Sequence, residues 1–381
     1  MKKYSTYVGM DVHARSVTCH ACIAETGENP AKTFSNAPSA AVVYEWLASL
    51  PQPVYCAYES GCTAYLMCRE LRKLGVDCDI IAITTLPRSE KEKKGKCDKL
   101  DAKSILGAIM NPMSTHTTVW VPDPDVEGAR DLARHYHDAV KSFKRVKQQL
   151  LSFLLRHGYV WNEKTKTGRP KAKWQGDFMK WLNAIRLEDE LAQKTLELYK
   201  NAVDVNKHLV DAAKEAIADA AESARWKPYV DAIGLLQGLG TSSAFLAAAE
   251  FGDFSRFDNG GQVSCWLGTV PRNSSSGDKE VHGSITKAGN SHLRCALVEG
   301  NSNLATRKGP QKKLAKGQTA SAEVQAIARK GNARLLKRYR HLIEDLGKNA
   351  NKAKTAIVNE QIRWIWAIGK TVQAELAAKQ A

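Results

Sequence analysis

Four carboxylates in the first third of the chain have the types and positions expected of a metal-binding catalytic centre. Asp11 ends one apolar run, Glu59 ends another just before a Ser-Gly turn, and Asp98 and Asp101 stand three residues apart. A carboxylate that ends a buried strand is costly unless it is paired or bound to a cation. Several carboxylate oxygens together suit Mg²⁺ or Mn²⁺, and two such ions can stabilise both reacting oxygens of a phosphoryl transfer. The pattern predicts metal-dependent phosphodiester chemistry.

Asp98 and Asp101 are expected at the start of a helix that reaches residue 110, where side chains three positions apart share one face. For Asp98, a role as a helix cap or as a charge favoured by the helix dipole is the alternative. The basic segment 88–96 runs directly into Asp98. Such a loop can hold a nucleic-acid backbone beside the acids.

The elements that must position these acids form an alternating pattern of strands and helices. Short apolar runs bounded by polar turn residues predict strands, whereas runs with a helical period predict helices. The predicted strands are 7–12, 17–24, 32–36, 54–58 and 78–83, with helices over 40–50, 64–74 and 100–110. This order predicts an N-terminal ribonuclease-H-like (RuvC-like) α/β domain over residues 1–120. In such a sheet, the strands that end at Asp11 and Glu59 are neighbours.

A long helical region follows and carries two apolar seams. Its first helix has apolar residues at alternating steps of four and three, the heptad pattern of a coiled coil: Leu132, Tyr136, Ala139, Phe143, Val146, Leu150 and Phe153. A second helix has Leu191, Leu198, Val205 and Ala212 at steps of seven, with Ala202, Leu209 and Ala216 four residues later. Residues 121–228 are therefore predicted to form a helical coiled-coil arm. The seams could pair within one chain or between subunits, and the second option predicts a homo-oligomer, a dimer or tetramer.

Residues 229–381 are predicted to form a mostly helical C-terminal domain. Segment 235–241 separates two apolar helical segments and suggests a helix-hairpin-helix, whose glycines would let backbone amides approach phosphate. An ordinary tight turn between two helices is the alternative. A Gly- and Ser-rich loop is expected over residues 268–289.

The charge balance favours a polyanionic partner. The 381 residues include 56 Lys and Arg against 40 Asp and Glu, and residues 301–381 hold 12 of the net charge of +16. Nucleic acid is the first candidate, and a solvated basic surface without a partner is the alternative.

Location is predicted from what the sequence lacks. It has no apolar run long enough to span a bilayer and no signal peptide at its start. A cytoplasmic, nucleoid-associated protein is therefore expected, with no membrane partner. The nine cysteines should be reduced thiols, and the lone Cys19–Cys22 pair is weak evidence for zinc.

Three motifs around the acids resemble the DEDD transposases of the insertion sequence one-ten family, which includes the Piv/MooV-type DNA invertases. They are Val8-Gly9-Met10-Asp11, Tyr58-Glu59-Ser60-Gly61 and residues 96–102, and they fit the family's order and spacing. A second block resembles the family's C-terminal transposase domain, through residues 236–240, 266–271, 276–277 and 285–290. With residues 335–339 and 364–368, the resemblance covers nearly the whole chain.

This resemblance implies a transposase or site-specific recombinase of a mobile element, with divalent metal held by Asp11, Glu59, Asp98 and Asp101. It also implies that Ser276 is a nucleophile whose hydroxyl attacks the DNA phosphate and holds it covalently. By composition alone, this serine would be an ordinary residue of a Gly- and Ser-rich loop. Donor and target DNA are the implied substrates, and a non-coding guide RNA, a bridge RNA, is an implied partner. Because the acids and the serine lie on two predicted domains, the site is expected to assemble from both, within one chain or across subunits.

Three other functions remain open from the residues. A hydrolytic RuvC-like nuclease, such as a junction resolvase, would use the acids to activate water and would need no serine. A nucleotide-binding ATPase of the actin or sugar-kinase type also opens on a strand with Asp, but it predicts a glycine-rich phosphate loop that the sequence after Asp11 lacks. A non-catalytic nucleic-acid-binding protein would bind without metal-dependent cleavage.

Overall fold

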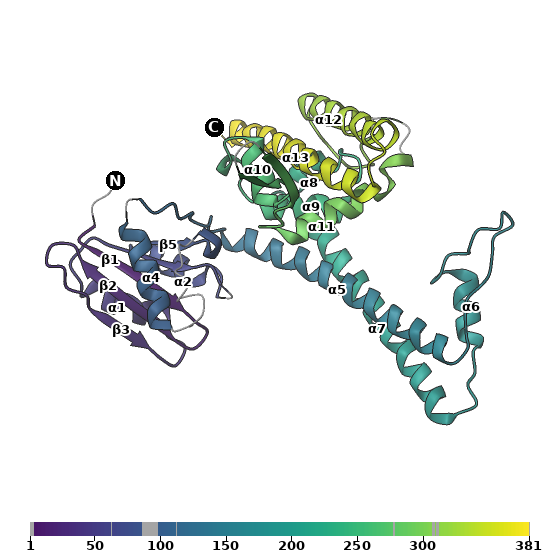
Figure 1. Ribbon diagram of the computed structural model, residues 1–381, viewed down its shortest axis with the longest axis horizontal. Coiled ribbons are helices and arrows are strands. Elements are labelled where there is room, and N and C mark those ends of the chain that lie inside the picture. Colours follow the sequence, from purple (N-terminus) through teal and green to yellow (C-terminus); the bar gives the residue numbers. More distant parts are fainter. Residues whose placement is uncertain are drawn as a thin grey trace. The chain divides into compact units, whose positions relative to one another are not determined.

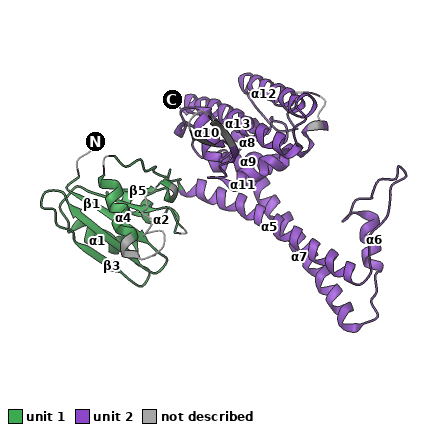
Figure 2. Ribbon diagram, in the orientation of Figure 1, with its two compact units in different colours: residues 1–123 green, residues 124–381 purple. Residues whose placement is uncertain are grey.

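The computed structural model describes residues 4–61, 63–85, 98–111, 113–276, 279–306, 309 and 312–380, and for a few of these, among them 98–100 and 273–276, the backbone alone. The chain divides into two compact units, Met1–Asp123 and Pro124–Ala381 (Figure 2). The boundary between the units lies three residues after residue 120, where the N-terminal domain is predicted to end. The predicted division of the second unit at residue 228 stays a prediction.

Unit 1 is built on a mixed five-stranded sheet with the strand order β3-β2-β1-β4-β5 (Figure 1). Strand β1 runs antiparallel to β2 and parallel to β4, which is parallel to β5. The elements are β1 Thr6–Val12, β2 Val17–Ile23, β3 Ala31–Phe34, α1 Ala40–Ala48, β4 Val54–Glu59, α2 Leu66–Lys73, β5 Asp77–Ile81, the 3-10 turn η1 Ile83–Thr85 and α4 Asp98–Met110. The predicted order of strands and helices is confirmed, and it is consistent with a ribonuclease-H-like domain.

The two faces of this sheet pack against different helices. Alternate residues of a strand point to opposite faces, and Val8 and Met10 of β1 are fully buried in the core that includes α1 and α2. On the other face, Ile105 of α4 packs with Ala57 of β4 and Ile81 of β5. Helix α4 therefore covers the face from which the odd-numbered residues of β4 project.

Unit 2 begins with a pair of long helices. Helix α5, Pro124–Arg156, and helix α7, Glu190–Ala221, lie side by side, and the short α6, Gly176–Ala184, packs at one end of the pair (Figure 1). Leu150 and Phe153 of α5 form one apolar cluster with Leu196 and Val203 of α7. The C-terminal end of the apolar seam predicted on α5 is thus buried against other helices of the same chain.

The seam predicted on α7 does not face α5. Leu191 and Leu198 are 72% and 69% exposed, and Val205 and Leu209 are exposed as well. Helix α7 packs through a different set of residues: Leu196, Val203, Ala213, Ile217 and Ala221. The two predicted seams therefore do not pair with each other within the chain, because α7 carries a second apolar face and uses that one for its own packing.

The rest of unit 2 is mostly helical. Its elements are α8 Lys227–Ile233, α9 Thr241–Phe251, η2 Phe254–Arg256, α10 Gly260–Leu267, β6 Pro271–Ser276, β7 Lys279–Ile285, α11 Ser291–Gly300, η3 Asn301–Thr306, α12 Ala322–Arg340, the π-helical turn η4 His341–Asp345 and α13 Ala350–Gln380. The expected loop over residues 268–289 is for the most part the antiparallel β6–β7 hairpin, in which Ser274 pairs with Val281. None of the helices in the described ranges is long and apolar enough to cross a membrane.

The predicted helix-hairpin-helix corresponds to α8, a turn and α9. Gly238 in this turn has a φ of 85°, and a Cβ at this position would lie 2.6 Å from Gly300 O. Two backbone segments therefore cross here at a distance that only glycine allows. Gly240, by contrast, has open space at its Cβ position. Close packing thus accounts for Gly238, and the approach of phosphate to this turn stays a prediction.

Candidate active site

Asp11 and Glu59 lie at the same edge of the unit 1 sheet. Met10 of β1 pairs with Tyr58 of the parallel strand β4, so the next residues, Asp11 and Glu59, stand at the ends of adjacent strands. Neighbouring residues in register project from the same face of a sheet. Glu59 pairs with Ile81, which packs with α4, so this shared face is the one that α4 covers. Asp11 is only 4% exposed, and Glu59 is half-buried.

Gly9 brings α4 against the strand that carries Asp11. A Cβ at Gly9 would lie 2.2 Å from Ala102 O and 2.5 Å from Leu106 N, so only glycine admits the helix this closely. Gly9 and Asp11 are two residues apart on β1 and share a face. Asp101, which is half-buried, immediately precedes Ala102. The start of α4 is therefore held beside the strand that ends near Asp11.

Hydrogen bonds hold the turn that follows Glu59. Tyr58 Oη donates to Ala64 O at 3.0 Å and accepts from Cys68 N at 3.2 Å. Burial raises the pKa of Tyr58 above its ordinary value, so the hydroxyl keeps the proton that it donates. Ser60 N donates to the carbonyl of β5 at 2.8 Å. The end of β4 is thus tied both to α2 and to β5.

His13 belongs to this site, although the sequence analysis did not single it out. Its Nε2 lies 3.0 Å from Asp11 Oδ2. The His13 side chain is 52% exposed and that of Asp11 is 5% exposed, so the imidazole lies on the solvent side of a buried carboxylate. The signal that could have found it is the two-residue spacing, which places side chains of an extended segment on the same side.

The side chains at this edge suit a hard divalent cation. Asp11, Glu59 and Asp101 offer carboxylate oxygens, the ligands that Mg²⁺ and Mn²⁺ prefer. Asp98 begins α4, one helical turn before Asp101, and its side chain lies outside the described residues. Among the side chains that the structure describes, no three of His, Cys, Asp and Glu form a group that could hold a metal ion. The predicted ligand set is therefore described only in part.

Ser276 lies in unit 2, at the end of strand β6, where it pairs with Lys279. Its side chain, too, is outside the described residues. The base of the hairpin is closely packed, because a Cβ at Gly268 would lie 1.9 Å from Ala288 O and one at Gly289 would lie 2.0 Å from Trp266 O. The acids and the serine thus belong to different units, each of which positions its own part of the predicted site.

Two protein-family models match the chain. A DEDD-type transposase model of the IS110 group matches residues 8–158, which include all four acids. A model described as "Transposase IS116/IS110/IS902 family" matches residues 232–316, which include the β6–β7 hairpin and Ser276.

Similar proteins cover most of the chain. It is 31% identical to a putative transposase, y4qE, of Sinorhizobium fredii, over 83% of this chain and 75% of that protein. It is 28% identical to the transposase for insertion sequence element IS1533 of Leptospira borgpetersenii, over 89% of this chain and 97% of that protein. A probable family 20 transposase of Pseudomonas aeruginosa is 25% identical over 86% of this chain and 87% of its own length. With the acids in DEDD order and Asp11 and Glu59 at one sheet edge, these likenesses show that the chain belongs to the IS110 family of DEDD transposases.

Proposed function

We propose that this transposase is the recombinase of its insertion sequence and that it cuts and exchanges DNA strands with a divalent cation and a serine nucleophile. The observation that carries the proposal is the edge of the unit 1 sheet. There Asp11 and Glu59 end neighbouring strands on one face, and Gly9 admits the acid-bearing helix α4 against that face. Carboxylates gathered on one side repel each other, and a cation offsets this repulsion. The proposed ligands of Mg²⁺ or Mn²⁺ are Asp11, Glu59, Asp98 and Asp101.

In the proposed reaction, the hydroxyl oxygen of Ser276 bonds to a phosphorus of the DNA backbone. The bond from that phosphorus to one deoxyribose oxygen breaks, the serine proton leaves, and the released sugar oxygen takes up a proton. The strand is then held as a phosphodiester to serine, and a sugar hydroxyl of another strand can attack it to rejoin the DNA. A bound divalent cation would stabilise the charge that develops on the phosphate oxygens. The acids would hold the cation, His13 would orient Asp11, and the hairpin would position the serine.

DNA, as donor and as target, is the proposed substrate, and a structured non-coding RNA is the proposed guide. The last fifth of the chain supports a nucleic-acid partner, because it holds 17 basic and five acidic residues. Such a density of positive charge binds phosphate backbones by releasing their counterions. The proposed assembly is a homo-oligomer.

The test compares Ser276→Ala with Ser275→Ala, a matched change of the preceding serine in the same strand. Each protein, with the RNA that co-purifies with it, is incubated with Mg²⁺ and end-labelled DNA that carries the insertion sequence ends. Denaturing electrophoresis then separates the covalent protein–DNA product from free cut DNA. We expect the wild type and Ser275→Ala to form the covalent product and Ser276→Ala to form none.

Other results would favour the alternatives. If Ser276→Ala still cuts DNA and releases free ends, the chain is a hydrolytic nuclease in which the acids activate water. If no form cuts DNA with Mg²⁺ although all bind it, the chain is a nucleic-acid-binding protein without this catalysis.

A further inference from the structure

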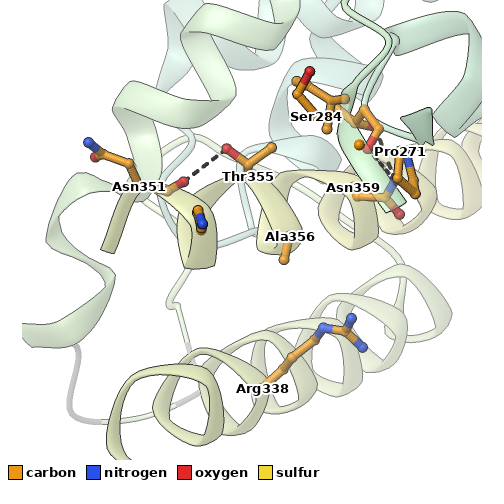
Figure 3. Close-up of a pocket in the computed structure, with 11 residues that line it drawn as sticks. Pro271, Ser284, Arg338, Asn351, Thr355, Ala356 and Asn359 are labelled. Atoms are coloured by element: carbon orange, nitrogen blue, oxygen red, sulfur yellow. Dashed lines mark hydrogen bonds between the residues drawn. The ribbon is translucent and has the colours of Figure 1, made fainter. Parts of the chain in front are cut away.

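A pocket of about 650 Å³ opens in unit 2 between α12, α13 and the base of the β6–β7 hairpin (Figure 3). Its lining includes Arg338 of α12, Asn351 and Lys352 of α13, and Pro271 and Ser284 of the hairpin. We propose that this pocket binds one unpaired nucleotide of a DNA or RNA strand that the protein holds. This inference rests on the proposed function and adds a binding site to it.

The charged side chains that line the pocket are basic. Arg338 and Lys352 come from two different helices, and no Asp or Glu is among the described residues of the lining. Arg338 shares its charge with Glu360, since its Nε lies 3.5 Å from Glu360 Oε2, but its side chain is still 46% exposed. Lys352 is exposed and makes no ion pair within the described part of the chain. Two such cations suit a phosphate group.

The remaining walls of the pocket suit a nucleobase. Ile285 and Ala356 supply apolar surface, and a base offers flat apolar faces and hydrogen-bonding edges. The exposed amide of Asn351 can both donate to and accept from such an edge. Asn359 is already engaged, because its Nδ2 donates to Thr269 O at 3.0 Å. This bond holds the chain that leads into the hairpin against α13 and so keeps the pocket's shape.

Size and position both favour an unpaired nucleotide. The volume is in the range of pockets that hold small ligands, and a base can enter such a recess only after it leaves its stack. Pro271 in the lining begins β6, and Ser276 ends it. Five residues of strand span about 17 Å, which corresponds to about five stacked nucleotides. In a strand of the DNA that is cut, the base in the pocket should therefore lie within about five nucleotides of the phosphate that Ser276 attacks.

A second pocket of about 430 Å³ provides a contrast within the same unit. It also has basic residues of α12 in its lining, Lys337 and Arg340, but Glu344 and Asp345 line it too. These carboxylates repel phosphate. The difference in charge assigns the nucleotide to the first pocket.

The first test uses the wild-type, full-length protein and needs no substitution. Single-stranded oligothymidylate that carries one 4-thiothymidine is irradiated with the protein in EDTA, and the crosslinked peptide is identified by mass spectrometry. Oligouridylate with 4-thiouridine and a blunt duplex with a paired 4-thiothymidine are treated alike. We expect single strands to crosslink to residues 283–285 or 351–359, and the stronger of the DNA and RNA signals identifies the source of the nucleotide. Crosslinks that avoid both segments, or that are as strong from the duplex, overturn the proposal.

The second test compares the double variant Asn351→Ala/Lys352→Ala with Lys348→Ala, an exposed lysine that is outside the pocket lining. Affinity for fluorescent oligothymidylate and oligouridylate is measured by anisotropy, and unfolding midpoints show whether each variant folds. We expect the double variant to bind the preferred strand about tenfold more weakly. The control should lose about twofold, because it removes one charge that does not line the pocket. Equal losses of affinity in the double variant and the control overturn the proposal. It is also overturned if free thymidine or uridine monophosphate competes for the protein as well as an unlabelled strand does.

These outcomes separate the pocket from the chemistry. If the crosslinks reach the pocket but the wild type forms no covalent serine product with Mg²⁺, the proposed function is wrong and the nucleotide site remains. If the serine product forms but the pocket neither crosslinks nor affects affinity, the nucleotide site is wrong and the proposed function remains.

Discussion

Strand β1 and helix α7 both carry a regular apolar pattern, and the two patterns have opposite surroundings. On β1, the alternating Val8 and Met10 are fully buried. On α7, Leu191 and Leu198 recur at seven residues and are 72% and 69% exposed. The spacing of apolar residues therefore identifies one face of a strand or helix. Whether that face is buried depends on the rest of the chain or on a partner.

The difference in burial also distinguishes the role of β1, which positions Asp11, from that of α7, which offers a face to another helix. Strand β1 has neighbouring strands on both sides and helices of its own unit on both faces, so the position of Asp11, a proposed metal ligand, is fixed from every side. Helix α7 packs one apolar face within the chain and leaves a second one exposed. A seven-residue repeat suits packing against another helix. We expect a second copy of the chain to supply that helix.

The largest effect is expected at the polar end of β1. Asp11→Asn keeps the size of the side chain and removes its charge, so it should lower Mg²⁺-dependent DNA cleavage about a thousandfold, since a catalytic metal contributes several kcal/mol. Glu25→Gln, a change of an exposed acid just after β2, should leave the cleavage rate unchanged. Initial rates on labelled DNA check this. Similar rates for the two variants would mean that Asp11 is not a metal ligand.

The next effect contrasts the two apolar faces of α7. Leu196→Ala removes a fully buried side chain and should lower the free energy of unfolding by about 3 kcal/mol. Leu198→Ala removes an exposed one and should change it by about 0.5 kcal/mol or less. Urea titrations of both proteins measure this difference.

Charged substitutions on the exposed apolar face of α7 test whether this face joins two copies of the chain. Leu191→Lys/Leu198→Lys should lower the molar mass measured by light scattering from that of an oligomer toward that of one chain. An unchanged molar mass would show that this face does not join copies of the chain. In the urea titrations, a large loss of stability in Leu198→Ala would show that another part of the protein or a second copy covers this face.

The smallest effect concerns the contact between β1 and α4. Gly9→Ala places a Cβ against Ala102 O and should cost about 2 kcal/mol of stability, together with a loss of DNA cleavage as α4 shifts. Gly107→Ala in α4 meets no atom within 4 Å, so it should be neutral or stabilise by up to about 1 kcal/mol. Thermal unfolding and cleavage rates are compared for both. Full activity in Gly9→Ala would mean that the close approach of α4 is not needed.

Most of unit 1 could be predicted from its sequence, because its strands are short apolar runs that are separated by turn residues. The neighbouring placement of Asp11 and Glu59 followed from the predicted fold class, and it is confirmed. The role of Gly9 could not be predicted, since it depends on a helix more than ninety residues away in the chain. The two-residue spacing of Asp11 and His13 indicates that their side chains can meet, and the structure shows this contact.

Unit 2 was less predictable for physical reasons. Gly and Ser residues favour a loop over residues 268–289, yet cross-strand pairing gives a hairpin, because β-propensity depends strongly on context. The exposed seam of α7 has the same apolar pattern as a buried one. Ser276 was singled out by family resemblance alone, and its role stays a proposal.

The central place of β1 in the sheet also affects how substrate would be received. The strands β2 and β4 flank it, and β3 and β5 lie outside them. Core strands open with free energies that approach that of global unfolding, so a central strand is ordered before any ligand arrives. In the proposed function, the backbone at Asp11 would thus lose little conformational entropy on binding DNA, and the acidic edge would be preorganised for association.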